Sequence, residues 1–157
     1  MKKVKTNAMR ILDSNNIEYE LNTYDVDENI DGKSVAKKLN EIEDKVFKTL
    51  VTIGQDKNYY IFVIPVTKEL DLKNAAKAVG VKKLEMIHVK DLKNITGYIR
   101  GGCSPIGMKK LFKTVIDESS KLYEKIYVSG GKLGTQIKIS PKDLKEVVKA
   151  DIYSLTK

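Results

Sequence analysis

Two apolar runs in the middle of the chain, residues 46–53 and 59–66, restrict the fold more than any other feature of the sequence. Both runs are rich in β-branched residues, and a short polar stretch at 54–58 separates them. This pattern is typical of an antiparallel hairpin whose strands lie in the core. A chain of 157 residues is long enough to bury one core around such a hairpin. We therefore expect one domain over residues 1–157.

The rest of the sequence predicts short helices and strands in irregular alternation. Helices are expected after Thr6, around residues 35–39, from 72 to 79 between Asp71 and Gly80, before Gly97, and from Pro141 to Lys149. Strands are expected at residues 17–24, 84–89, 114–117, 125–129 and 135–139. Because no regular strand–helix–strand repeat runs through the chain, the pattern favours an α+β fold with a mixed, curved or barrel-like sheet.

The chain is basic, with 29 lysine and arginine residues against 21 acidic residues and a formal net charge of +8. A basic domain of this size attracts polyanions, although a lysine-rich surface also serves solubility. The charges are unevenly distributed, because residues 72–84 and 98–116 contain basic side chains and no acidic ones. Such one-signed stretches are typical of a surface that faces phosphates. The candidate RNA contacts are Lys73, Lys77, Arg100, Lys109 and Lys110.

The scarcity of cysteine and histidine limits the chemistry that the chain can perform. Cys103 and His88 are the only residues of their types, so the usual zinc sites cannot form, and we expect neither a metal nor another cofactor. A thiol nucleophile usually needs an activating base, so we interpret Cys103 as a small residue in a tight loop. The single cysteine and the amphipathic start of the chain predict a cytoplasmic protein without a membrane segment.

Lys48 lies inside the first apolar run, where both faces of the strand are expected to be buried. Burying an ammonium group is costly. One interpretation is an edge strand from which the side chain reaches water. The other is a fixed cation on the floor of a pocket that receives a phosphate or a developing oxyanion. Ser129, just before Gly130 at a strand end, is either the partner of Lys48 in a Ser–Lys dyad, a substrate contact, or a turn residue.

A glycine-rich segment between Gly97 and Gly107 is too dense in glycine for a regular helix or strand. Within it, Gly101 and Gly102 allow backbone N–H groups to approach a substrate closely and to stabilise an oxyanion. A purely structural turn is the alternative interpretation. The segment lacks the spacing and the final lysine of a Walker phosphate loop.

Six ordered segments share motifs with a known family. They are KTNAMR at 5–10, VFKTLV at 46–51, LDLK and AAK within 70–77, KKLEM at 82–86, TGYIRGGCSPIGMKK at 96–110 and VSGGKLG at 128–134. Together they resemble the YbaK-type deacylases, relatives of the editing domain inserted in bacterial prolyl-tRNA synthetases, and the resemblance covers nearly the whole chain. One departure is Leu133, where many relatives carry arginine, so a basic contact there is missing.

The resemblance implies a mixed, barrel-like sheet of six to seven strands flanked by helices. It implies hydrolysis of Cys-tRNA(Pro), the product formed when prolyl-tRNA synthetase loads cysteine, and also of Cys-tRNA(Cys). The implied partners are tRNA(Pro) charged with cysteine and prolyl-tRNA synthetase. In the implied mechanism the substrate's own thiol attacks its ester carbonyl and gives a cyclic thioester and free tRNA. A chain without a metal or an activated nucleophile can still catalyse this step by orientation and oxyanion stabilisation.

The resemblance also assigns roles to individual residues. Lys48 positions the substrate, and Gly101 opens a Gly-x-x-x-Pro loop that contributes backbone donors. Cys103 is not a catalytic residue in this scheme. The residues implied to bind the substrate are Tyr24, Thr49, Gly102, Ser104, Pro105, Ser129 and Gly130.

Two alternatives to this function stay open. Relatives of the same fold differ mainly in pocket size, so another misacylated tRNA, such as Ala-tRNA(Pro), is the first alternative. The second is a non-catalytic module that binds tRNA or a synthetase, although the presence of both Lys48 and the loop from Gly101 to Pro105 argues against it. The sequence also leaves open whether the thiol or a water molecule attacks the ester.

Overall fold

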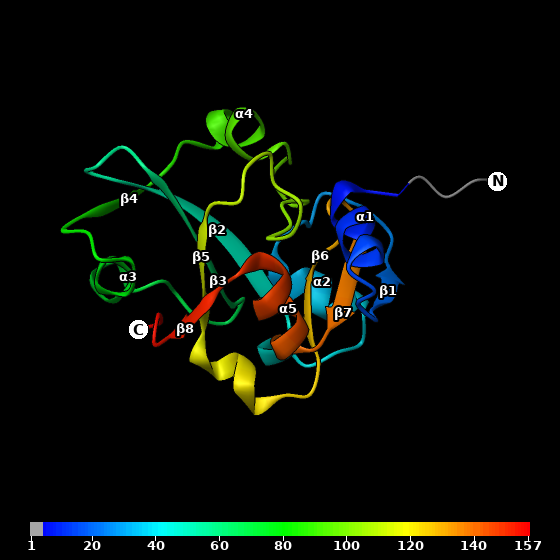
Figure 1. Ribbon diagram of the computed structural model, residues 1–157. Helices are drawn as coiled ribbons and strands as arrows, with labels where there is room; N and C mark the ends of the chain where they lie inside the picture. The colour runs from blue at the N-terminus through cyan, green and yellow to red at the C-terminus, as the bar shows by residue number, and fades with distance from the viewer. Residues whose placement is uncertain (1–4) are drawn as a thin grey trace.

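The computed structural model describes residues 5–157, and Figure 1 labels its helices and strands. The five α-helices in this range are α1 (Asn7–Ser14), α2 (Gly32–Lys38), α3 (Leu72–Val79), α4 (Leu92–Thr96) and α5 (Pro141–Val148). The strands are β1 (Glu20–Thr23), β2 (Phe47–Gly54), β3 (Tyr59–Pro65), β4 (Leu84–Met86), β5 (Lys113–Asp117), β6 (Ile126–Ser129), β7 (Thr135–Ile139) and β8 (Asp151–Tyr153). Three short 3-10 helices complete this part of the chain, namely η1 (Glu43–Lys45), η2 (Val89–Asp91) and η3 (Glu118–Leu122).

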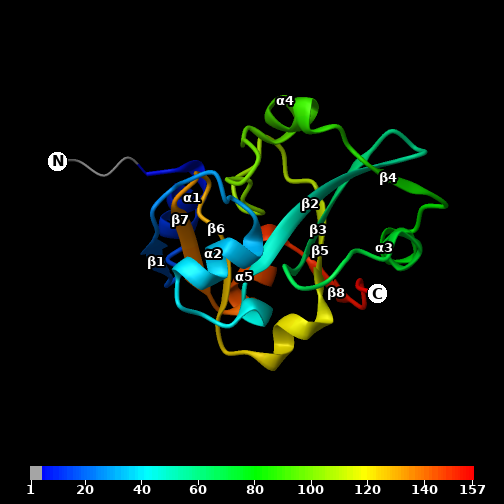
Figure 2. The ribbon, with the colours of Figure 1, turned by 180° about the vertical axis from the view of Figure 1, so that it is seen from behind.

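The predicted hairpin is confirmed and forms the centre of the larger sheet. β2 and β3 pair antiparallel, from Phe47 opposite Pro65 to Ile53 opposite Tyr59. They belong to a five-stranded sheet of order β4-β2-β3-β5-β8, in which β5 and β8 are parallel to β3. A second, antiparallel sheet has the order β1-β7-β6. The two sheets lie side by side in both Figure 1 and Figure 2.

The α+β class is confirmed, whereas the barrel-like sheet of six to seven strands is a wrong prediction. The eight strands within residues 5–157 form two sheets that do not close on each other. Val46, the residue just before β2, forms one isolated parallel bridge with Tyr127 of β6. Further along β2, residues Thr52 to Gly54 pair with β4 instead. Because β4 covers that part of the β2 edge, the ladder to β6 cannot continue and the sheets remain separate.

Side-chain caps set the helix ends where the sequence predicts them. The hydroxyl of Thr6 accepts a hydrogen bond from the Met9 N–H and begins α1. Asp71 caps α3 in the same way, and Gly80, at a φ of 75°, ends that helix. Ser140 caps α5. These residue types satisfy the N–H groups that a helix N-terminus leaves without partners, and glycine adopts the left-handed conformation at the C-terminus at little cost.

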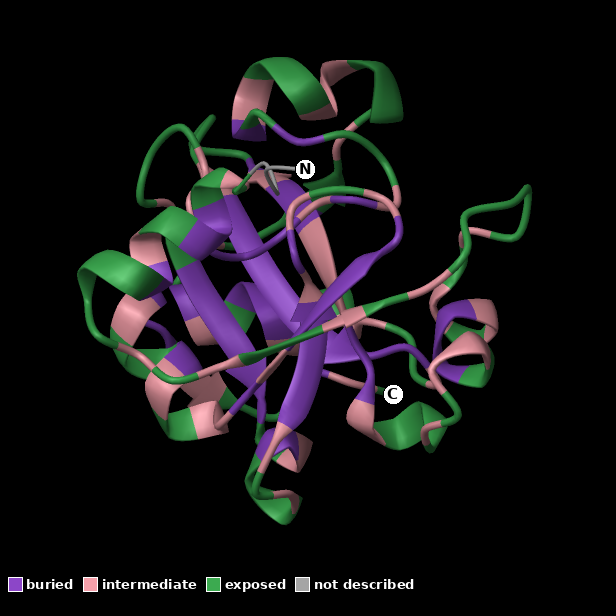
Figure 3. Cartoon of the chain, turned by 90° about the vertical axis from the view of Figure 1, so that its right-hand side faces the viewer, coloured by how far each residue is buried: buried purple, intermediate pink, exposed green. Residues whose placement is uncertain are grey.

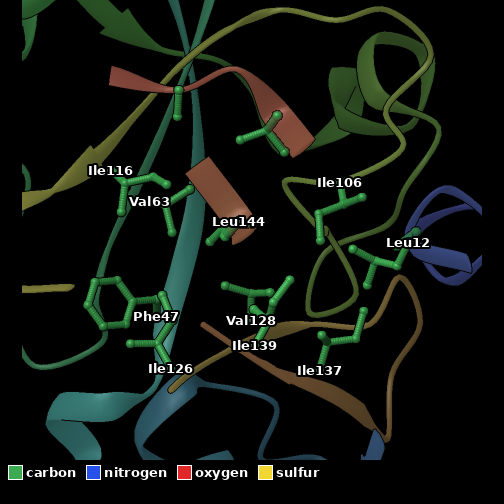
Figure 4. Packing of buried hydrophobic residues seen from close by; sticks show 13 residues of the cluster. Leu12, Phe47, Val63, Ile106, Ile116, Ile126, Val128, Ile137, Ile139 and Leu144 are labelled. Carbon is green, nitrogen blue, oxygen red and sulfur yellow. The ribbon is translucent and has the colours of Figure 1, made fainter. Parts of the chain in front are cut away.

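The main core lies between the two sheets. Figure 3 shows buried strands surrounded by helices whose outer faces are exposed. In Figure 4, side chains from both sheets converge with Leu144 of α5, Leu12 of α1 and Ile106 of the glycine-rich segment; the labelled side chains of the sheets are Phe47, Val63, Ile116, Ile126, Val128, Ile137 and Ile139. This packing fixes the start of β2 against the β6 and β7 strands. Across residues 5–157, no helix combines the length and the apolar character that crossing a membrane requires.

Candidate functional site

A small cavity of about 120 Å³ lies where the start of β2 meets α2, the glycine-rich segment and the β6–β7 pair. Its lining residues are Ile30, Gly32, Val35, Val46, Phe47, Lys48, Thr49, Val66, Gly101, Cys103, Ser129 and Gln136. An open cleft of about 660 Å³ adjoins the small cavity and shares Lys48 and Gly101 with it. Cavities for drug-sized ligands usually measure about 300–1,000 Å³. The small cavity therefore suits a group of a few atoms, and the cleft suits a larger part of the same ligand.

Lys48 lies at the junction of the small cavity and the cleft. It is opposite Ile64 in the β2–β3 ladder, in the part of β2 that β4 does not cover. Its side chain is half-buried, and within residues 5–157 no hydrogen bond or ion pair engages its ammonium group. Burial lowers the pKa of Lys48 below its ordinary value of 10.5; Glu69 opposes this shift, and Lys33 adds to it. The pocket interpretation of Lys48 therefore fits its position better than that of a solvated edge residue.

Two buried polar atoms in the small cavity have no hydrogen-bond partner among residues 5–157. They are Oγ1 of Thr49 and Oε1 of Gln136, and both residues line the cavity. Nδ2 of Asn22, the cross-strand neighbour of Gln136, is also buried without a hydrogen-bond partner. Leaving a buried polar group unpaired costs about 1–3 kcal/mol, and such groups in folded proteins call for an explanation. A ligand that brings hydrogen-bonding groups into the cavity provides one.

The glycine-rich segment packs directly on the turn between β6 and β7. Gly101 has a φ of 82°, and a Cβ added there would lie 2.6 Å from Cδ2 of Leu133. A Cβ on Gly102 would lie 3.0 Å from Cα of Lys132. Glycine is therefore favoured at Gly101 mainly by its left-handed backbone conformation and at Gly102 by the close approach of the Lys132 backbone. The side chain of Leu133 packs against Gly101.

The backbone donors of this segment are only partly available. The N–H of Gly102 donates to the carbonyl of Ile99 at 3.0 Å, so it is used inside the turn. The N–H groups of Gly101 and Cys103 donate to no acceptor among the described residues, and both residues line the small cavity. These two groups, rather than the N–H of Gly102, are the donors that a substrate carbonyl can reach.

The start of α1 holds both glycine-containing loops in place. The Thr6 hydroxyl donates to the carbonyl of Gly130, and Nδ2 of Asn7 donates to the carbonyl of Gly107 at 2.6 Å. The buried hydroxyl of Tyr98 donates to the carbonyl of Ile106, also at 2.6 Å. The bonds of Thr6 and Asn7 join segments at least 100 residues apart in the sequence, and that of Tyr98 closes the glycine-rich segment on itself. They make the wall of the small cavity a fixed surface.

Of the residues predicted to bind substrate, Thr49 and Ser129 line the small cavity. Oγ of Ser129 accepts a hydrogen bond from the N–H of Gly131 at 3.2 Å, and within residues 5–157 no hydrogen bond joins it to Lys48. Ser129 is therefore placed as a turn residue that also faces the cavity, and the Ser–Lys dyad is not formed.

The other predicted substrate contacts lie outside the cavity wall. The N–H of Tyr24 donates to Gly134, and its ring lies 5.7 Å from the ammonium of Lys38. The remaining residues of this group are buried and do not line the cavity, namely Gly102, Ser104, Pro105 and Gly130. They belong to the glycine-rich segment and to the turn between β6 and β7.

Cys103 faces the small cavity but is poorly suited to act as a nucleophile. Burial raises the pKa of its thiol to about 11, although a hydrogen bond with Thr96 partly opposes the shift. The reactive form of cysteine is the thiolate. The thiol therefore stays protonated at neutral pH.

The predicted basic residues fall in three places. Arg100 lines the open cleft together with Lys48 and with Lys33, which the sequence did not single out. Lys73 and Lys77 belong to α3, which lies at the opposite end of the molecule from β6 and β7 in Figures 1 and 2. The segment between α4 and β5 carries the last two, Lys109 and Lys110, on the surface.

The cleft also contains carboxylates, but no arrangement of ligands for a metal ion. Glu28 and Asp31 line the cleft. The carboxylate of Asp31 caps α2 and accepts hydrogen bonds from the N–H and hydroxyl of Ser34, which lower its pKa. Within residues 5–157, no group of three or more histidine, cysteine, aspartate or glutamate side chains is placed to hold a metal ion.

Residues 31–147 match the family model described as an aminoacyl-tRNA editing domain. The chain therefore belongs to the aminoacyl-tRNA editing family, which confirms the resemblance and the predicted class of enzyme, an aminoacyl-tRNA deacylase. A protein of Enterococcus faecalis (strain ATCC 700802 / V583), named "Putative Cys-tRNA(Pro)/Cys-tRNA(Cys) deacylase EbsC", is 44% identical over 153 residues. This alignment covers 97% of this chain and 93% of the relative.

Two solved structures share the fold. One is the hypothetical protein APE2540, with a TM-score of 0.89 and 21% identity over 97% of this chain and 100% of that one. The other is described as "a putative trans-editing enzyme for prolyl tRNA synthetase". Its TM-score is 0.83, with 21% identity over 99% of both chains. At this level of identity the two structures establish the architecture alone.

Proposed function

We propose that this protein is a trans-editing deacylase that removes cysteine from Cys-tRNA(Pro), and also from Cys-tRNA(Cys). The observation that carries the proposal is the small cavity. There Lys48, two unpaired backbone donors and the unpartnered oxygens of Thr49 and Gln136 line a space for a group of a few atoms. Membership of the editing family supports the reaction class, and the name of the Enterococcus faecalis relative supports cysteine as the amino acid.

The small cavity is proposed to hold the aminoacyl group with its ester carbonyl toward the glycine-rich segment. The N–H groups of Gly101 and Cys103 donate to the carbonyl oxygen as it gains negative charge, and the ammonium of Lys48 stabilises the same charge. The acceptor oxygens Oε1 of Gln136 and Oγ1 of Thr49 receive the α-ammonium group. In this arrangement each unpartnered group of the cavity obtains a partner from the substrate.

Cleavage is proposed to use the thiol of the substrate. Its sulfur attacks the ester carbonyl, a C–S bond forms, and the C–O bond to the ribose breaks. The proton of the thiol passes to the departing ribose oxygen, so the products are a cyclic cysteine thioester and free tRNA. Water then opens the thioester to cysteine. Since the thiol of Cys103 is protonated and the Ser–Lys dyad is not formed, the substrate supplies a nucleophile that the described residues do not.

The open cleft is proposed to receive the 3′ end of the tRNA. Lys33 and Arg100 line it together with Lys48 and can contact phosphates, while Lys48 faces the ester. Lys109 and Lys110 are proposed to extend the contact along the surface, whereas the position of Lys73 and Lys77 on α3 argues against a role at the same site. The proposed partners are tRNA(Pro) charged with cysteine and prolyl-tRNA synthetase, from which the misacylated tRNA is released. A cytoplasmic place of action stays a prediction.

A second candidate substrate is Ala-tRNA(Pro), which the volume of the small cavity also accommodates. A cavity of about 120 Å³ that holds a cysteinyl group also holds the smaller alanyl group. Shape alone discriminates poorly between such groups, since a small apolar difference in size is worth about 1–3 kcal/mol. Selectivity for cysteine must then come from the chemistry of the thiol.

The test compares single-turnover deacylation of Cys-, Ser- and Ala-tRNA(Pro) by the purified chain. We expect the cysteine ester to be cleaved at least about tenfold faster than the others, because neither alanine nor serine supplies a comparable nucleophile. A cyclic thioester should be trapped at early times. Equal rates on the three substrates, or free cysteine without any cyclic species, would show that water attacks the ester. No deacylation of any of them would refute the proposed function.

A further inference from the structure

A second large cavity lies away from the proposed editing site. Its volume is about 850 Å³, and it is formed by the end of η3, the first half of α5 and the edge strand β8. None of its lining residues belongs to the small cavity or to the open cleft. The two sites also face different sides, because α5 is turned toward the viewer in Figure 1 and α2 in Figure 2. We call it the α5–β8 cavity.

The walls of the α5–β8 cavity carry two tyrosines. Tyr123 is half-buried, and Tyr153 on β8 is 41% exposed. They do not stack on each other, since the aromatic pair found within residues 5–157 is Tyr59 with Phe112. The ammonium of Lys45 lies over the ring of Tyr123 at 5.8 Å, and this tyrosine packs against the main core, so the accessible aromatic face is that of Tyr153. An accessible aromatic face at the side of a cavity is suited to stacking against a flat ring, and base-on-aromatic stacking is a common way to hold a nucleobase.

Three lysines surround the same cavity, namely Lys121, Lys142 and Lys145. None of these lysines is in the six ion pairs found within residues 5–157. Asp151, a carboxylate of the lining, pairs instead with Lys113 at 3.9 Å. Glu124 is the carboxylate of the lining that stays without an ion pair in that range. The balance of charge therefore favours an anion.

The N-terminus of α5 also favours an anion in this cavity. This eight-residue helix begins at the cavity, with Ser140 as its cap and Pro141 as its first residue. The N–H of Lys142 donates to no acceptor among the described residues. Because the N-terminus of a helix carries a partial positive charge, this N–H and the ammonium groups nearby favour a phosphate.

An independent observation comes from Ser120. Its side chain is 0% exposed, and its Oγ has no hydrogen-bond partner among residues 5–157. Its carbonyl accepts from the N–H of Tyr123 at 3.3 Å, so the backbone is used in the turn while the hydroxyl is not. Ser120 lines the α5–β8 cavity. A buried hydroxyl at the wall of a cavity is an unmet hydrogen bond that a bound polar molecule can satisfy.

We propose that the α5–β8 cavity binds a nucleotide, with the base beside Tyr153 and the phosphate at Lys142 and Lys145. The hydroxyl of Ser120 forms a hydrogen bond with the base or the ribose. A volume of about 850 Å³ accommodates one mononucleotide. The same chemistry is offered by a free nucleotide and by an unpaired nucleotide of an RNA. The site does not depend on the editing function, because it shares no residue with the proposed editing site.

The experiment is a titration of the full-length, isotope-labelled chain with AMP, followed by amide chemical shifts. We expect shifts in residues 120–124, 140–145 and 151–153, with a dissociation constant at or below about 1 mM. Tyr153→Ala and Lys142→Glu should each weaken binding at least about fivefold. Tyr153 is exposed and Lys142 lies in the first turn of a helix, where glutamate is favourable, so both variants should fold. Lys90→Glu, an exposed lysine on η2, is the matched control and should leave the affinity unchanged.

A parallel titration with tetra-adenylate RNA separates the two sources. Shifts of the same residues by the RNA but not by AMP would assign the site to RNA, and stronger shifts by AMP would assign it to the free nucleotide. The proposal is overturned if neither ligand shifts these residues, or if shifts are confined to the surroundings of Lys48. It is also overturned if Tyr153→Ala and Lys142→Glu bind AMP as the original chain does. Deacylation measured on the same variants should be unchanged, which keeps this result separate from the editing function.

Discussion

The ammonium group of Lys48 is half-buried in the folded chain, although a charged group is more stable in water. Burial lowers the pKa of Lys48 in the folded chain relative to the unfolded chain. The folded state therefore binds this proton less tightly, and stability rises as the pH climbs from the folded pKa toward 10.5. At neutral pH the charge consequently opposes folding. A charged residue that costs stability and lines a cavity is typical of a functional site.

Cys103 provides the residue-scale test of the substrate-thiol mechanism. We predict that Cys103→Ala retains deacylation of Cys-tRNA(Pro) within about threefold, because the backbone N–H of this residue acts on the carbonyl and its thiol stays protonated. Single-turnover kinetics on the folded variant measure the effect. Ser129→Ala serves as the comparison, since its side chain also faces the cavity. A folded Cys103→Ala protein without activity would instead make this cysteine the nucleophile.

The individual residues of the site were partly predictable from the sequence. Lys48 and Gly101 stand out because a charge in an apolar strand and a glycine pair are visible locally, whereas Thr49 was indicated by the family resemblance alone. Gln136 and Lys33 do not stand out. Gln136 reaches the cavity through the pairing of β7 with β6, and Lys33 through the docking of α2 beside β2, and both depend on contacts between distant segments.

At the scale of elements, the site depends on two loops pressed against each other. The glycine-rich segment rests on the turn between β6 and β7, and both loops are tied to the start of α1 through Thr6 and Asn7. A short α1 with an ordinary cap therefore contributes to the site without supplying a side chain to the cavity. The contacts of Thr6 and Asn7 connect the family motif at the start of the chain with the motifs near residues 100 and 130.

Gly101→Ala should lose deacylation and more stability than Gly80→Ala. Both glycines have positive φ, of 82° and 75°, but a Cβ at Gly80 meets nothing within 4 Å, whereas one at Gly101 would lie 2.6 Å from Leu133. We expect Gly80→Ala to cost about 1 kcal/mol for its conformation and Gly101→Ala to cost about 1–3 kcal/mol. Chemical denaturation and deacylation of both variants measure this. Equal stabilities with unchanged activity would contradict the close packing of the two loops.

The sequence predicts elements well where their signals are local. Asp71 and Gly80 mark the ends of α3, and the central hairpin follows from two apolar runs and a short turn. β8 was not predicted, because three residues are too few to show an alternation and its parallel pairing with β5 is a tertiary contact. The prediction of a barrel-like sheet was wrong for a related reason. Whether β2 pairs with β4 or with β6 is decided by contacts between distant segments.

At the scale of the whole molecule, the net charge of +8 predicts an electrostatic contribution to tRNA binding. We expect affinity for tRNA(Pro) to fall with salt at a slope of about −2 on logarithmic axes, if Lys33, Arg100 and one of Lys109 and Lys110 contact three phosphates at the single-stranded end. Fluorescence anisotropy at several salt concentrations measures the slope. Lys33→Glu should make it shallower by about 1, and Lys73→Glu on α3 should leave it unchanged. A flat profile would indicate that the synthetase provides most of the contact with the RNA.

The most direct test of the proposed editing site is the single-turnover rate of Cys-tRNA(Pro) deacylation by Lys48→Met, with Lys73→Met on the distant helix α3 as the matched control. We predict that Lys48→Met loses at least about 10²-fold in rate, because a fixed cation beside the carbonyl is removed. Its thermal midpoint should not fall, since the charge of Lys48 opposes folding at neutral pH. Lys73→Met should keep the original rate. A folded Lys48→Met protein that deacylates Cys-tRNA(Pro) at a near-normal rate would contradict the central claim.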